Sequence, residues 1–143
     1  MGLLDSLQRF FKAGTNGFND FERLVLSKVV EALPFALQGR LQRRIEAVNL
    51  VQRLDGGREV NCFVMQQGKP VLPVETRIDA TAGEKSLAKF VVEGSAGTAN
   101  SGQIWLVDGN LFSLEFDQPT EHADANAVAG VRVELVEIAE FSA

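Results

Sequence analysis

The chain has 143 residues, of which 45% are hydrophobic and 23% charged. It is long enough to form one domain with a sizeable core, and too apolar to be disordered throughout. Its single cysteine excludes a disulfide framework, its single histidine excludes a histidine-rich metal site, and its net charge of −5 disfavours nucleic acid as the main partner.

The first predicted element is an amphipathic helix at the N-terminus. Five large apolar side chains fall on one side at helical spacing: Leu3, Leu4, Leu7, Phe10 and Phe11. Such a helix docks on the protein's own core, in the groove of a partner or on a membrane surface. The membrane surface is not favoured, because the helix has too few cationic positions to attract anionic lipids strongly. The first six residues also match the N-myristoylation pattern, which fixes too few positions to distinguish acylation from an ordinary helical start.

Two more helices are predicted before residue 49. The second begins after Asn19, whose side chain caps the Glu22 amide while Glu22 reaches back, and it ends before Pro34. The third covers residues 35–47, and an alternative extends it as far as Arg53. Three arginines on its flank are candidates for binding carboxylates or phosphate, namely Arg40, Arg43 and Arg44. The competing interpretation is that they pair with acids of the sheet or are solvated.

From residue 49 onwards apolar residues recur at every second position, which predicts strands. We expect strands at residues 49–54, 59–66, 71–78, 86–93, 103–107, 111–116 and 131–138. Asp108-Gly109-Asn110 is the clearest hairpin turn. Pro70 and Pro73 make residues 71–78 an edge strand, since proline donates no ladder hydrogen bond. The glycine-containing stretch 94–102 is expected to be a flexible loop.

These elements predict an α+β fold in a single domain. Residues 1–48 supply two or three helices, and residues 49–143 supply a curved antiparallel meander of six to seven strands. Short connections require antiparallel neighbours, because a parallel crossover needs a dozen or more residues. We expect the helices to cover one face or one end of the sheet.

No arrangement typical of a catalytic site is visible in the sequence. Cys62 alternates with Val60 and Val64 along one strand, which indicates a buried and unreactive thiol. His122 lies in an acidic loop and has no recognisable nucleophile to serve. The sequence therefore predicts a protein that is not an enzyme and that uses no cofactor or metal. Without a secretory signal or a spanning segment, the expected location is the cytoplasm.

Charge is distributed unevenly along the chain. Residues 1–54 carry +3 and residues 55–143 carry −8, and the acidic part includes three loop carboxylates, Asp117, Glu121 and Asp124. We therefore predict a small protein-binding module for a basic partner, such as a toxin-neutralising immunity protein or an adaptor. The alternatives are a binder of a small apolar ligand, with a cavity between helices and sheet, and a peripheral membrane protein. A further interpretation is that the two halves only neutralise each other.

Overall fold

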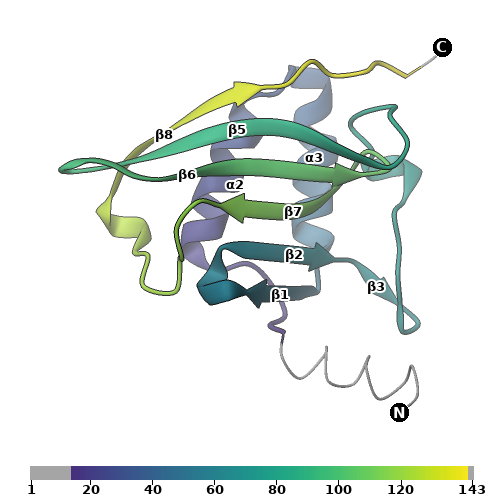
Figure 1. Cartoon of the computed structure of the whole chain (residues 1–143). Coiled ribbons are helices and arrows are strands. Elements are labelled where there is room, and N and C mark those ends of the chain that lie inside the picture. The colour runs from purple at the N-terminus through teal and green to yellow at the C-terminus, as the bar shows by residue number, and fades with distance from the viewer. Residues whose placement is uncertain (1–13, 142–143) are drawn as a thin grey trace.

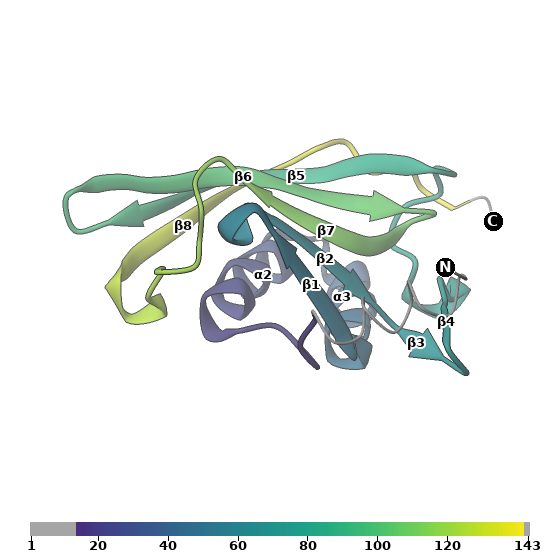
Figure 2. The ribbon, with the colours of Figure 1, turned by 60° about the horizontal axis from the view of Figure 1, so that its bottom comes forward.

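The computed structural model describes residues 14–141. Within them, two α-helices cover one face of an antiparallel sheet of six strands (Figures 1 and 2). This arrangement confirms the predicted α+β class. The main sheet is open rather than closed, and a small sheet of two strands lies beyond one end of it. The predicted amphipathic helix, with Leu3, Leu4, Leu7, Phe10 and Phe11, lies outside the described residues.

Both helices begin and end where the sequence predicted. Helix α2 (Asp20–Ala32) is capped by Asn19, whose side chain accepts a hydrogen bond from the Glu22 N–H at 2.9 Å. The Glu22 carboxylate in turn accepts one from the Asn19 N–H at 2.9 Å, which completes a capping box. Helix α3 (Phe35–Ala47) follows directly after Pro34. The side chains that the helices bury include Phe21, Val25, Leu26, Val29 and Leu41.

The strands of the main sheet are ordered β1-β2-β7-β6-β5-β8, and all neighbours are antiparallel. Their bounds are β1 (Leu50–Leu54), β2 (Glu59–Phe63), β5 (Glu84–Gly94), β6 (Gly97–Val107), β7 (Asn110–Phe116) and β8 (Val128–Leu135). The small sheet consists of β3 (Met65–Gln66) and β4 (Lys69–Pro70). Because β1 already begins at Leu50, the alternative in which the third helix continues to Arg53 is wrong.

Two predicted segments differ from the structure. Residues 71–78, predicted as an edge strand, are irregular apart from one 3-10 turn, because side chains rather than a neighbouring strand bind their carbonyl groups. Residues 94–102, predicted as a loop, belong mostly to a long hairpin in which β6 begins at Gly97. Gly102 serves close packing there, since a Cβ atom at this position would lie 2.0 Å from the Glu115 carbonyl oxygen.

The predicted turn between β6 and β7 is confirmed. Asp108 and Gly109 both have positive φ, at 47° and 76°, as a two-residue hairpin turn requires. The register pairs Val107 with Asn110 directly across the turn. The sequence signal was reliable because the turn conformation depends on these two residues themselves.

The core lies between the helices and the sheet. Its members on the inner face of the sheet include Val60, Cys62, Phe90, Ile104, Leu114 and Phe116. The Phe116 ring lies 5.6 Å from that of Phe21 on α2 and 5.3 Å from that of Phe90 on β5, so it joins the two layers.

Cys62 should react slowly with thiol reagents. Its side chain is fully buried, and burial raises the pKa of the thiol to about 12, although the nearby Arg44 charge acts in the opposite direction. We expect modification by a disulfide reagent in native buffer to be roughly 100-fold slower than for a free model thiol. The measurement follows absorbance of the released thiolate, with the denatured chain as the fast control. A native rate close to that of the model thiol would contradict the buried position.

Candidate functional site

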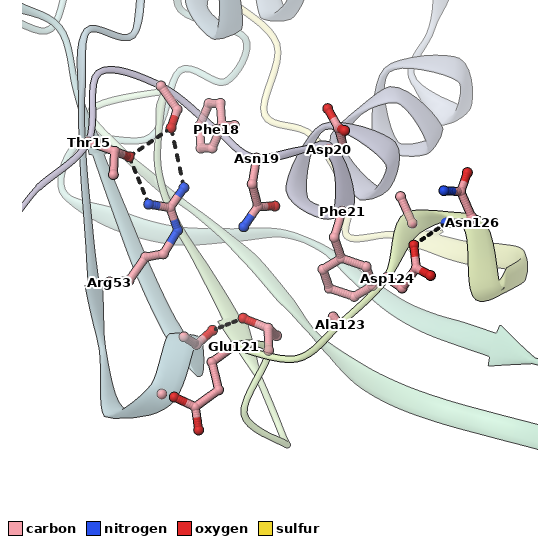
Figure 3. A pocket seen from close by; sticks show the side chains of 15 residues that line it. Thr15, Phe18, Asn19, Asp20, Phe21, Arg53, Glu121, Ala123, Asp124 and Asn126 are labelled. Carbon is pink, nitrogen blue, oxygen red and sulfur yellow. Dashed lines mark hydrogen bonds between the residues drawn. The ribbon is translucent and has the colours of Figure 1, made fainter.

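An open groove of about 990 Å³ lies where three segments far apart in the sequence meet. One wall is the segment that leads into α2, together with the first turn of that helix. The other walls are the end of β1 with the turn that follows, and the loop between β7 and β8. Asn19 and Phe21 point into the groove, with Arg53 on one side of them and Asp124 on the other (Figure 3).

Arg53 anchors one side of the groove. Its Nε and Nη2 donate to the two oxygens of the buried Glu22 carboxylate at 2.7 and 2.6 Å. Its Nη1 donates to the Thr15 hydroxyl at 2.7 Å, and its Nη2 also donates to the Gly17 carbonyl at 3.2 Å. Glu22 therefore compensates the charge of Arg53 within the wall, and the guanidinium fixes the segment before α2 to the sheet.

The β1–β2 turn and the loop after β7 are locked to each other. The Thr120 hydroxyl donates to the Gly57 carbonyl at 2.8 Å. The N–H groups of Thr120 and Glu121 both donate to the Gly56 carbonyl, at 2.8 and 3.0 Å. Gly57 has a φ of +86°, and a Cβ atom there would lie 2.2 Å from the Thr120 Oγ1, so this contact requires glycine. The wall that carries Glu121 and Asp124 is thereby held against the sheet.

The structure brings two of the three predicted acidic residues together. Glu121 and Asp124 line the groove, and their side chains are exposed. Asp117 lies outside it, where the Ser101 hydroxyl donates a hydrogen bond to its carboxylate. The acidic loop therefore has one part that lines the groove and another part, at Asp117, that is hydrogen-bonded to Ser101 of β6.

Among the groove residues that the sequence did not predict are Asp20, Phe18 and Phe21. Both phenylalanines belong to the core and are 6% exposed, so a small apolar part of their rings lines the floor of the groove. Asp20 and Glu121 lie on opposite sides of Phe21 (Figure 3). An acid in the first turn of a helix is ordinary and gives no functional signal. Only the tertiary structure brings positions 20 and 121 to the same groove. The lining is net negative, because three carboxylates stand against one arginine, and that arginine is already paired with Glu22.

Arg44 is part of the fold rather than of a surface site. It is 1% exposed and donates from Nε to the Leu111 carbonyl at 3.1 Å and from Nη1 to the Val71 carbonyl at 3.0 Å. Burial lowers the pKa of Arg44, while the neighbouring Cys62 raises it. The guanidinium thus bridges α3 to β7 and to the segment after β4.

Arg40 and Arg43 also fail to join Arg44 in a common anion site. Arg40 donates from Nε to the Arg77 carbonyl at 2.6 Å and from Nη2 to the Val74 carbonyl at 2.7 Å. Arg43 is the exposed member of the three. The sequence did not predict that Arg40 and Arg44 bind backbone carbonyls, because these carbonyls lie between 27 and 67 residues further along the chain.

Residues 14–141 contain no group of three or more histidine, cysteine, aspartate and glutamate side chains placed to hold a metal ion. No helix in the same range has the length and apolar character needed to cross a membrane. Comparison of the chain with protein-family models, with curated proteins and with solved structures found no match. The function is therefore inferred from the groove itself.

Proposed function

We propose that the protein is a non-catalytic binding module that recognises a basic segment of another protein in this groove. The observation that carries the proposal is that three carboxylates, Asp20, Glu121 and Asp124, lie at separate points around the groove, while parts of two phenylalanine rings line it. A lysine or arginine side chain offers an apolar stem, which packs on a ring, and a cationic head group, which carboxylates attract. The same charges repel acidic partners.

The construction of the walls supports this proposal. The Arg53–Glu22 pair holds one side, and the Thr120–Gly57 contact holds the other. A groove that is already ordered loses little conformational entropy when a partner binds. The net charge of −5 adds long-range attraction for a basic partner and raises the rate of encounter. An immunity protein that neutralises a basic toxin and a cytoplasmic adaptor both fit this description.

Neutralising the three groove acids should weaken binding mainly by slowing association. The test captures the partner on immobilised protein, identifies it, and measures association rates for D20N/E121Q/D124N at low and physiological salt. Exposed charges act mainly on the encounter, and salt screens them beyond a Debye length of about 8 Å at physiological ionic strength. We expect a roughly tenfold lower association rate at low salt, together with a flatter salt dependence than in the unmodified protein.

The matched control is E31Q/E46Q/E75Q, which removes the same formal charge at exposed positions outside the groove. We expect it to retain most of the association rate, because the field at the groove depends on the nearest carboxylates. An acidic partner, or an equal loss of rate in the two triple variants, would overturn the proposal.

A further inference from the structure

The two edges of the main sheet differ. At one edge, the backbone of Thr15 pairs with Val51 of β1, with its N–H donating at 2.9 Å and its carbonyl accepting at 2.8 Å. At the other edge, β8 is eight residues long and is the last strand in the order (Figure 1). Within residues 14–141 no strand pairs with the outer side of β8. Such an edge presents N–H and carbonyl groups on which a further strand can add.

The backbone groups that β8 presents at this edge follow from its register with β5. The Val136 N–H donates to the Leu87 carbonyl at 2.9 Å, so position 136 points toward β5. Because these directions alternate along a strand, Val131, Val133 and Leu135 direct their N–H and carbonyl groups away from β5. The register is continuous over positions 130–135, with no bulge to reverse this alternation.

We propose that two copies of the protein associate through this edge, with β8 pairing antiparallel to β8 of the second copy about a two-fold axis through Val133. This register places Val133 opposite its own equivalent and Val131 opposite Leu135 of the second copy. These are the residues whose backbone groups point outward, so each facing pair exchanges hydrogen bonds. The six-stranded sheets of the two copies then form one continuous sheet.

The charges of β8 match this register. Arg132 falls opposite Glu134 of the second copy, and the symmetry repeats the pair on the other side of the axis. Both side chains are exposed, and they occupy non-hydrogen-bonded positions, where facing side chains are closest. Glu93 on β5 holds the Arg132 Nε and Nη2 at 2.9 and 2.8 Å, which leaves further guanidinium N–H groups for the second copy.

The apolar side chains of β8 match it as well. Val131, Val133 and Leu135 pack against the core but remain partly exposed at the edge. In the proposed pairing, each of them faces another apolar side chain, so the association extends the apolar inner face of the sheet. None of these three residues lines the groove, so the inference goes beyond the proposed function and does not depend on it.

Charge reversal tests this register. The unmodified protein should have twice the 15.6 kDa mass of one chain in sedimentation at about 100 µM. R132E and E134R each place like charges opposite one another at both symmetric positions, which should raise the dissociation constant roughly tenfold or more. An equimolar mixture of the two variants restores opposite charges and should give a mixed dimer in native mass spectrometry. The double variant R132E/E134R should self-associate again.

Proline at position 133 provides a test that does not depend on charge. V133P removes an N–H that points away from β5, so β8 keeps its ladder to β5 while the outer edge loses a donor. We expect V133P to be folded by circular dichroism and monomeric. A monomeric unmodified protein at 100 µM would overturn the proposal. The proposal would also be overturned if dimers persisted in V133P and in both charge-reversal variants, or if the equimolar mixture restored no dimer.

Discussion

Alanine at Gly109 should lower the free energy of unfolding by about 3–4 kcal/mol, and alanine at Gly68 by only about 1 kcal/mol. Both glycines have a φ of 76°, so the backbone strain is equal. A Cβ atom at Gly109 would lie 2.1 Å from the Arg77 Cγ and 2.3 Å from the Asp79 carbonyl oxygen, whereas nothing lies within 4 Å at Gly68. The difference therefore measures the packing of the β6–β7 turn against the segment before β5.

Urea denaturation of the two variants beside the unmodified protein provides the measurement. The slope of free energy against urea should stay constant, so that the shift in midpoint reports stability alone. Equal losses at the two positions would show that the turn does not contact Arg77 and Asp79.

Methionine at Arg44 should lower the free energy of unfolding by about 2–3 kcal/mol, while methionine at Arg43 should change it by less than about 0.5 kcal/mol. Methionine fills the space of the arginine stem but donates no hydrogen bond. The Leu111 and Val71 carbonyls would lose the charged donors that they now have at 3.1 and 3.0 Å. Removal of the buried charge relieves a desolvation cost, and the loss at the two carbonyls exceeds that relief.

The same denaturation experiment distinguishes the two arginines. Arg43 is the matched control, since it lies on the same helix and is exposed. If R44M lowered the free energy of unfolding no more than R43M does, the Arg44 guanidinium would contribute no net stability to the contact between α3 and β7.

Elements whose boundaries depend on neighbouring residues could be predicted from the sequence. Asn19 and Glu22 cap α2 across three positions, and Pro34 separates the helices by its own covalent geometry. The turn at Asp108 and Gly109 belongs to the same class, since its positive φ values are a property of those two residues. Each of these signals lies within a few residues of the structure that it determines.

Segments whose conformation depends on distant partners could not be predicted. Residues 71–78 have the composition of a strand, but the donors for their carbonyl groups come from Arg40 and Arg44 on α3. Gly102 resembles a loop residue in the sequence, yet it lies mid-strand, where the close Glu115 carbonyl leaves no room for a side chain. No local pattern indicates either contact.

The same distinction between local and distant signals applies to the residues of the candidate site. The acidic composition of the chain pointed to Glu121 and Asp124, because charge can be counted along a sequence. Asp20, Phe18 and Phe21 line the same groove and were missed. Their residue types are ordinary for a helix start, and their proximity to the acidic loop arises only when the helices pack on the sheet.

The irregular segment 71–78 has a consequence for proteolysis. Leu72 and Val74 are exposed and lie in a stretch that is irregular apart from one 3-10 turn, where proteases commonly cleave. A protease must bind its substrate as an extended strand, through the carbonyl groups of the substrate backbone. Here four of those carbonyls already accept hydrogen bonds from Arg40, Arg44 and Asn110. Cleavage therefore requires the segment to detach from α3 and β7 first, so its rate follows the opening of the fold rather than surface exposure.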